Sequence, residues 1–376
     1  IAMGGLVSVM SYALVLWWTR RRRLAVVAGL LLALNPALFL YEPLGYEMLT
    51  VFGVTMTVFL FALFDRTKVT VALVLAMVAL TLTTLTRSAY HPILLAPVIA
   101  LASAAAGTQW RRVLVAGLIL CLLPLAWCAK NQTRFGFFGM SSWAGQNVWK
   151  IAALNYSQDE LERFAREGLI EPNVTQVTVF HLPEDYQTIG FTQETGRPAL
   201  DGNNRNNINI IGVSQMYGRN AMRLVRHEPA HYAANVIKAY RLFCQPTNNA
   251  FALGDNRLFI IHNALSSEVV QGRAFNLVTK RLIGQDWLLT FWVIGLPGLF
   301  LWYAAQALRN YRRVPYGIHA TALLAGYTVA VSCLLEYGEN DRFKFTIEPL
   351  LWVMVVIVLA SFLKRRSHER NTGTEG

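Results

Sequence analysis

Long apolar stretches separated by short charged connections dominate this chain. The stretches reach or approach the length of about 20 residues that crosses a bilayer as a helix. They run at about 1–18, 24–41, 48–64, 69–86, 92–107, 112–129, 286–306, 318–335 and 346–363. A polar segment from about 130 to 285 separates the sixth stretch from the seventh. The pattern predicts an all-α polytopic membrane protein with about nine transmembrane helices and a large, mixed but mainly helical insertion.

Basic residues mark alternate connections between these stretches. They lie at 20–23, 65–68, 111–112, 309–313 and 364–366, all on one side of the predicted membrane. By the positive-inside rule, this side is cytoplasmic. The sequence therefore predicts four parts, which are a first helical bundle at 1–129, an extracytoplasmic domain at 130–285, a second bundle at 286–363 and a cytoplasmic tail at 364–376.

Composition favours a lipid environment over a soluble one. Of the 376 residues, 54% are hydrophobic and 15% are charged, whereas a soluble domain carries about 25% charged residues. The net charge of +12 would indicate a nucleic-acid partner in a soluble protein. Outside the polar segment, however, the basic residues mostly flank apolar stretches, so membrane lipid is the expected partner and nucleic acid is not. Ile1 lies inside an apolar stretch without a charged leader, so we expect the natural N-terminus upstream of it.

The four cysteines do not form a recognisable framework. Cys121, Cys128 and Cys333 lie in apolar stretches, and Cys244 stands alone in the polar segment. This spacing predicts neither a disulfide scaffold nor a cysteine-rich metal site.

Local patterns within the polar segment predict several elements. Ser157 stands three residues before Glu160, which is the spacing of a capping box at the start of an amphipathic helix ending near Gly168. Thr175 to Phe180 could form a strand, and the Gly/Asn-rich run 201–207 predicts a loop. Two helices are expected after that loop, at about 208–226 and 229–243.

The run from His227 to His231 reads His-Glu-Pro-Ala-His and matches the H-E-x-x-H pattern of zinc metallopeptidases. In such sites both histidines face one way on a continuous helix. Pro229 lacks an N–H and would interrupt that helix, and it suits the first turn of a new one. A junction between two helices is therefore favoured, and a zinc peptidase is a minor alternative.

Two acidic residues stand in a short connection on the outer side. Glu42 and Glu47 flank Pro43-Leu44-Gly45-Tyr46, so both carboxylates are expected near the headgroup plane. They could bind a divalent cation, Mg²⁺ or Mn²⁺, which takes oxygen ligands and could bridge to a phosphate. The alternative is a pair of solvated loop carboxylates. No pattern indicates an organic cofactor.

The connection before the last stretch combines cations with aromatic rings. In an extended segment, Arg342 and Lys344 would share one side and Phe343 and Phe345 the other. The cations could then hold a lipid phosphate while the rings face acyl chains. The alternative is an interfacial anchor.

This arrangement resembles the GT-C membrane glycosyltransferases, and most closely the bacterial relatives of the dolichyl-phosphate-mannose mannosyltransferases. Glu339 to Pro349 is similar to the family's last outer motif. Lys130 to Gly136 with Trp143 to Trp149 resembles the stretch after a middle span, and His227 to Tyr232 resembles its His-x-Pro-x-x-Tyr helix start.

The resemblance implies transfer of a sugar from a polyprenyl-phosphate donor to an envelope glycan, lipid or protein acceptor, outside a bacterial inner (plasma) membrane. The family's catalytic acid would precede Ile1, and Glu42 and Glu47 resemble its second outer loop and are the candidate catalytic residues here. Arg342 matches the family's phosphate-region arginine, with Lys344 and Arg87 as further candidates for the donor phosphate. The candidate acceptor or sugar contacts are Tyr46, Tyr90, His91, Asn147, Trp149, Glu339 and Asn340.

Two other functional classes share this plan. A transporter of lipid-linked glycans should carry ionisable residues near the middle of its spans, and these spans carry almost none. An oligosaccharide polymerase or ligase has the same helices and outer loop, so it is the nearest alternative.

Overall fold

The computed structural model describes residues 2–35, 37–40, 45–191, 210–245, 247 and 287–372, and throughout them the regular structure is helical. Two compact units divide the chain. The apolar unit comprises the described residues of 1–126, 243–329 and 341–376, and the polar unit comprises those of 127–242 and 330–340.

Among the described residues, six helices are long and apolar enough to span a membrane. They are α1 (Ala2–Thr19), α4 (Gly45–Thr67), α7 (Trp110–Phe135), α16 (Trp287–Asn310), α17 (Tyr316–Leu335) and α18 (Asn340–Thr372). The expectation of an integral membrane protein is therefore confirmed. The predicted count of about nine is not established by these six.

Three of the predicted stretches form shorter helices. The fourth and fifth stretches form α5 (Val71–Thr86) and, after a 3-10 turn at Pro92–Leu94, α6 (Leu95–Ala105). The second stretch divides into α2 (Arg22–Ala33) and α3 (Ala37–Leu40). Asn35 contributes to this division, because its side-chain oxygen accepts a hydrogen bond from the backbone N–H of Ala37 at 3.0 Å, as a helix N-cap does.

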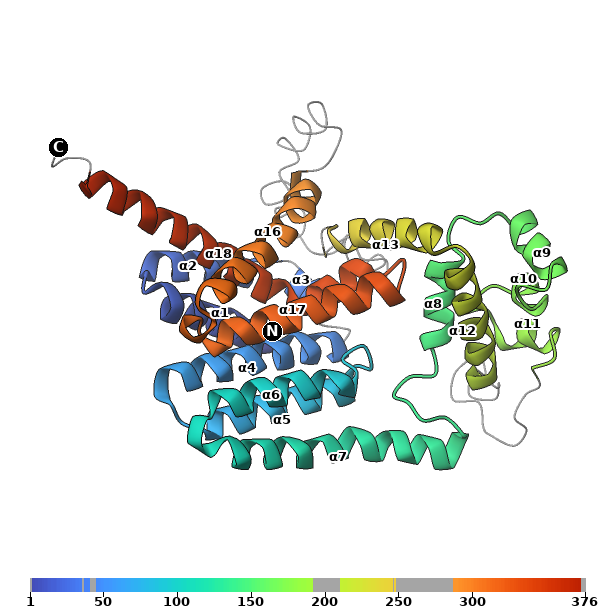
Figure 1. The fold of residues 1–376 in the computed structure, drawn as a ribbon, viewed down its shortest axis with the longest axis horizontal. Coiled ribbons are helices and arrows are strands. Elements are labelled where there is room, and N and C mark those ends of the chain that lie inside the picture. The colour runs from blue at the N-terminus through green and yellow to red at the C-terminus, as the bar shows by residue number, and fades with distance from the viewer. Residues whose placement is uncertain are drawn as a thin grey trace. The chain divides into compact units, whose positions relative to one another are not determined.

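Small residues let the helices of the apolar unit approach closely. Helices α4, α5 and α6 lie side by side (Figure 1). A Cβ atom added to Gly53 of α4 would lie 2.1 Å from the hydroxyl of Thr83 on α5. A Cβ on Gly117 of α7 would lie 2.7 Å from the side chain of Ile99 on α6. Such contacts are typical of helix packing in lipid, where dispersion rather than the hydrophobic effect holds helices together.

The polar unit is built from shorter helices. They are α8 (Ala144–Ala152), α9 (Gln158–Arg166), α10 (Asn173–Gln176), α11 (Pro183–Gln187), α12 (Ile210–His227) and α13 (Pro229–Phe243), whose last residue belongs to the apolar unit. Helices α8 and α12 lie beside each other (Figure 1). Trp149 of α8 and Tyr217 of α12 pack with their ring centroids 5.7 Å apart, in a core that also contains Phe164 of α9. This unit therefore has a hydrophobic core of its own.

The local predictions for the polar segment are mostly confirmed. Ser157 and Glu160 form the expected capping box at the start of α9, and α12 and α13 match the two later helices. The strand at 175–180 is wrong, because α10 occupies Asn173–Gln176 and the hydroxyl of Thr175 donates to the carbonyl of Pro172 at 2.9 Å. The predicted loop at 201–207 lies outside the described residues.

The His-Glu-Pro-Ala-His run forms a junction between two helices, as predicted. Helix α12 ends at His227 and α13 begins at Pro229. Glu228 accepts a hydrogen bond from the hydroxyl of Tyr156 at 2.9 Å. The ring of His231 stacks on Tyr156, with centroids 3.9 Å apart, and its Nε2 lies 2.7 Å from the carbonyl oxygen of Leu154. Both polar side chains thus hold the junction against the segment before α9.

Candidate functional site

A buried carboxylate joins two arginines within the apolar unit. The side chain of Glu47 has no exposed surface, and its Oε1 accepts a hydrogen bond from Nε of Arg342 at 2.5 Å. Its Oε2 forms an ion pair with the guanidinium of Arg87. We call Glu47, Arg87 and Arg342 the two-arginine site. It unites three of the residues that the sequence had singled out for binding or catalysis.

Helix ends position these three side chains. Glu47 lies in the first turn of α4, and Arg342 lies in the first turn of α18, which starts at Asn340. Arg87 directly follows α5, and its backbone N–H donates to the carbonyl of Thr83 at 3.0 Å. Since a short connection reverses the chain between α4 and α5, the start of one helix lies beside the end of the other. The site therefore belongs to a single end of these apolar helices.

Aromatic rings cover both guanidinium groups. The guanidinium of Arg342 lies over the ring of Tyr46 at 5.3 Å, and that of Arg87 lies over the ring of Phe343 at 4.7 Å. The side chains of Arg342 and Arg87 are only 13% and 8% exposed. Arginine stays protonated even in such surroundings, so the three side chains carry two positive formal charges against one negative. Guanidinium groups are the side chains best suited to hold a phosphate or carboxylate.

The candidate residues Tyr90 and His91 fix the connection after α5. The hydroxyl of Tyr90 lies 2.6 Å from Oγ1 of Thr346 and 3.1 Å from Oγ1 of Thr328. Burial raises the pKa of Tyr90 above its ordinary value, so this hydroxyl stays neutral. Nδ1 of His91 accepts a hydrogen bond from the backbone N–H of Ile93 at 3.3 Å, and burial lowers the pKa of His91.

Lys344 does not accompany Arg342, so the extended arrangement predicted for this segment is wrong. Because α18 begins at Asn340, residues two apart are rotated by about 200° around the helix axis. Lys344 is fully buried, and its Nζ donates to the carbonyl of Cys244 at 3.3 Å and also to that of Gln245. The second predicted phosphate cation therefore holds the backbone after α13.

Asn340 is one reason why α18 begins before the apolar stretch predicted at 346–363. Its side-chain amide donates to the carbonyls of Ser332 and Glu336 at 2.8 and 3.0 Å. Its side-chain oxygen accepts a hydrogen bond from the backbone N–H of Gly338 at 3.1 Å. These bonds fold the connection after α17 into a tight bend, which leaves no extended run before the last helix.

Four of the remaining candidate residues lie in the polar unit. They are Asn147, Trp149, Glu339 and Asn340. Trp149 is part of that unit's core, and Asn340 is buried within the bend. Glu42 lies outside the described residues.

The fit of a divalent cation at Glu47 is poor. Both carboxylate oxygens are already in contact with a guanidinium, so a cation would have to displace an arginine. In the part of the chain that the structure describes, no group of three His, Cys, Asp or Glu side chains is arranged to hold a metal ion.

A second ion pair, within the polar unit, was missed in the sequence. Nζ of Lys150 donates to Oε1 of Glu336 at 2.9 Å. Burial raises the pKa of Glu336, and the charge of Lys150 opposes that rise. The partners are 186 residues apart, so no local spacing could have indicated the pair.

Comparison with known proteins adds no family assignment: no protein-family model, curated protein or solved structure matches this chain.

Proposed function

We propose that this protein is a GT-C-like membrane glycosyltransferase that moves a sugar from a polyprenyl-phosphate donor to an envelope glycan, lipid or protein acceptor. The observation that carries the proposal is the two-arginine site, in which Arg87 and Arg342 converge at one end of apolar helices. A polyprenyl phosphate presents an anionic group at the membrane surface and a long apolar tail below it. Guanidinium groups at helix ends suit the phosphate, and the surrounding apolar helices suit the tail.

For sugar transfer from a polyprenyl phosphate, the site must stabilise the departing phosphate. The acceptor oxygen forms a bond to the anomeric carbon while the bond from that carbon to the phosphate oxygen breaks. The electron pair leaves with the polyprenyl phosphate, and the acceptor proton passes to a carboxylate. Arg87 and Arg342 would stabilise the negative charge of the leaving phosphate.

Glu47 fits the role of a positioning residue better than that of a base. Both of its oxygens contact guanidinium groups, so neither is available to accept a proton from an acceptor. Glu42 is therefore the better candidate to accept the proton, with Glu47 aligning the two arginines.

We place the site on the outer face of a bacterial inner membrane, with about nine helices crossing it. The support is the distribution of charge along α4, where Glu47 lies in the first turn and Arg66 in the last. The basic connection that follows Arg66 would be cytoplasmic by the positive-inside rule. The opposite end of α4, and with it the two-arginine site, would then face outward.

Binding of the donor phosphate provides the direct test. The full chain in lipid nanodiscs would be titrated with a polyprenyl monophosphate, comparing wild type with Arg342→Ala and Arg342→Lys. We expect at least tenfold weaker binding by Arg342→Ala, and an intermediate loss by Arg342→Lys, because lysine keeps the charge without the fork. Arg66→Ala, an exposed arginine at the other end of α4, is the matched control and should bind normally. A folded Arg342→Ala protein that binds the phosphate as tightly as wild type would refute the proposal.

The same experiment addresses the polymerase or ligase alternative. Such an enzyme, like a lipid-linked glycan transporter, would not use a glycosyl-phosphate donor. A folded wild-type protein that does not bind polyprenyl monophosphate would favour one of these alternatives.

A further inference from the structure

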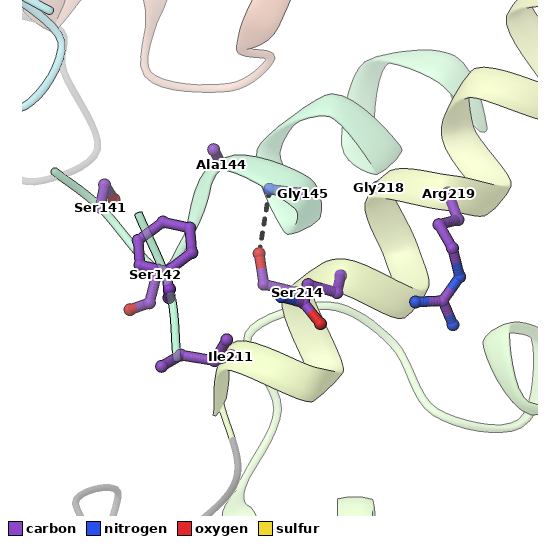
Figure 2. A pocket seen from close by; sticks show the side chains of 10 residues that line it. Ser141, Ser142, Ala144, Gly145, Ile211, Ser214, Gly218 and Arg219 are labelled. Atoms are coloured by element: carbon purple, nitrogen blue, oxygen red, sulfur yellow. Dashed lines mark hydrogen bonds between the residues drawn. The ribbon is translucent and has the colours of Figure 1, made fainter. Parts of the chain in front are cut away.

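A pocket of about 390 Å³ lies in the polar unit, between α12 and the segment that leads into α8. Figure 2 shows the side chains of Ser141 and Ser142 on one side of it, with Ile211, Ser214 and Arg219 on α12 opposite. The surface that lines this pocket is almost wholly apolar. The pocket belongs to neither the two-arginine site nor the core of the unit.

Internal hydrogen bonds engage polar groups of the lining. The hydroxyl of Ser214 accepts a hydrogen bond from the backbone N–H of Gly145 at 3.0 Å (Figure 2). The hydroxyl of Ser141 accepts one from the backbone N–H of Trp143 at 3.2 Å. Apolar side chains that line the pocket are those of Phe137, Ala144 and Ile211. A hydrocarbon chain suits such a lining, because it buries apolar surface and has no polar group of its own to leave unpaired.

The wall of the pocket follows directly on a helix that is long and apolar enough to span a membrane. Helix α7 has 26 residues, which at 1.5 Å per residue is about 39 Å, against about 30 Å for the hydrocarbon core of a bilayer. The last turns of α7 would therefore reach the headgroup region. Gly136 ends the helix with a φ of 67°, as is common at helix C-termini, and the next residue, Phe137, lines the pocket.

Exposed aromatic rings stand beside the same point of the chain. Phe135, the last residue of α7, is 46% exposed, and Phe138 is 60% exposed. Large apolar side chains that gather at a surface mark contact with a partner or with lipid. Because these two rings adjoin the end of a spanning helix, lipid is the favoured contact.

The exposed side of α12 is basic. Arg219, Arg223 and Arg226 are spaced by four and three positions, which places them on one face of the helix, and all three are exposed. We call these three residues the arginine face. Helix α12 contains no acidic residue.

One carboxylate opposes the arginine face among the described residues. An oxygen of Glu171 lies 3.4 Å from the guanidinium of Arg219 and 3.8 Å from that of Arg223. Three guanidinium groups against this one carboxylate leave the face with a net positive charge. Since Arg219 also lines the pocket, positive charge stands at the rim of an apolar space.

We propose that the pocket and the arginine face together bind anionic phospholipid, with an acyl chain in the pocket and lipid phosphate groups on the arginines. Basic side chains beside an apolar surface are the combination that holds a protein segment on an anionic bilayer. A soluble acidic partner would match the charge of the arginine face but would leave the apolar pocket uncovered. The proposal goes beyond glycosyl transfer and requires neither the two-arginine site nor a sugar donor.

Photo-crosslinking tests this proposal on the full chain in phosphatidylcholine nanodiscs. The discs contain a small fraction of phosphatidylglycerol or of phosphatidylcholine that carries a diazirine on one acyl chain. After illumination, peptide mapping by mass spectrometry locates the attached lipid. Adducts on α7, whose apolar side chains are widely exposed, serve as the internal standard.

Two matched double variants separate the arginine face from charge in general. Arg219→Gln/Arg226→Gln removes two of its cations and leaves Arg223 beside Glu171. Arg163→Gln/Arg166→Gln removes two exposed arginines from α9 of the same unit. A third variant, Ala144→Trp, places an indole in the pocket. Amide protection of α12 confirms that each variant is folded.

In wild type we expect phosphatidylglycerol adducts on the pocket lining at about fivefold or more the yield of phosphatidylcholine, because each basic residue near an anionic lipid strengthens its binding by about that factor. Arg219→Gln/Arg226→Gln should reduce this preference severalfold, Ala144→Trp should abolish the pocket adducts, and Arg163→Gln/Arg166→Gln should behave like wild type. Equal yields from the two lipids in wild type, or an unchanged preference in folded Arg219→Gln/Arg226→Gln, would overturn the proposal. A wild type without lipid adducts in the pocket would also overturn it, and would leave the arginine face to a soluble acidic partner.

Discussion

At the scale of single residues, contacts between near neighbours could be read from the sequence and contacts between distant residues could not. Ser157 and Glu160 are three positions apart, and the capping box that they form was predictable from that spacing. Glu47 and Arg342 were each singled out, but their pairing across 295 positions was not. Helix packing decides which distant side chains meet, and single-residue patterns carry little information about it.

Loss of the Glu47 charge should destabilise the apolar unit. In Glu47→Gln, the carboxylate that both guanidinium groups contact becomes a neutral amide, while the two arginines remain charged and nearly buried. Removing one partner of a buried ion pair typically costs about 3–5 kcal/mol, so we expect a clearly lower thermal midpoint in detergent or nanodiscs. The exposed Glu167→Gln is the control and should melt like wild type. An unchanged midpoint for Glu47→Gln would show that the two-arginine site contributes little to stability.

The capping box of α9 should make the stability of this helix depend on pH. Hydrogen bonds from the backbone N–H and hydroxyl of Ser157 lower the pKa of Glu160. Because the folded state favours the ionised carboxylate, its stabilising contribution is present above the ordinary glutamate pKa near 4.3. It is lost as the pH falls through the lowered pKa. Amide protection of α9, corrected for intrinsic exchange, should therefore fall on acidification in wild type and change less in Glu160→Gln.

Removal of the cap hydroxyl tests the same helix end at neutral pH. Ser157→Ala deletes the oxygen that accepts from the N–H of Glu160, and loss of an N-cap typically costs about 1 kcal/mol. This corresponds to roughly fivefold faster exchange of the α9 amides if they exchange by local opening. Thr175→Ala should leave α9 unaffected, because among the described residues the hydroxyl of Thr175 donates to the carbonyl of Pro172 in the nearby α10 turn. Equal protection of α9 in Ser157→Ala and wild type would contradict the role of the cap.

At the scale of elements, apolar length and proline placement predicted most helices correctly. The long apolar stretches became helices, and Pro229 begins α13 as expected from its fixed φ and missing N–H. The predictions failed at short segments whose residue pattern fits an extended strand but which form a helix. Phe343 and Phe345 alternate with cations as in a strand, yet the bend held by Asn340 starts a helix instead. Thr175 has a side chain that favours strands, but no neighbouring strand is described for it to pair with.

The contact between α8 and α12 should be intolerant of a methyl group. Gly145→Ala places a Cβ atom against the carbonyl oxygen of Ser214, a rigid backbone group that cannot rotate away. Overpacking of this kind typically costs about 1–3 kcal/mol, so we expect reduced amide protection across α8 and α12. Gly5→Ala in α1, where a Cβ meets nothing within 4 Å, should leave that protection unchanged. Full protection of α12 in Gly145→Ala would mean that the two helices separate without penalty.

At the scale of the whole molecule, sequence predicted the class of protein and left its interior arrangement open. The excess of apolar residues and the basic residues in alternate connections indicated a membrane protein, and six sufficiently long apolar helices among the described residues confirm that class. Which helix ends meet depends on contacts such as Gly53 with Thr83 and Gly117 with Ile99. Those contacts arise from surface shape, which a hydropathy pattern does not encode.

Orientation in the membrane is testable with two introduced cysteines. In a background lacking the four native cysteines, Arg22→Cys lies at the start of α2 and Glu167→Cys at the end of α9, both at exposed positions. A membrane-impermeant thiol reagent added to intact cells should label position 167 and should label position 22 only after permeabilisation. Labelling of position 22 alone in intact cells would reverse the proposed topology.

The long separation between Glu47 and Arg342 also bears on how the protein is made. Ribosomes add about 5–20 residues per second, so the 295 positions between the two residues represent roughly 15–60 s of synthesis. During that interval Glu47 and Arg87 have both emerged, whereas the second arginine does not yet exist. The newly made α4 and α5 therefore carry an incomplete set of charges until α18 is synthesised. Arrival of α18 is thus the event that completes the two-arginine site, and a chain cut short before it should be recognised as unfinished by the quality control of the cell.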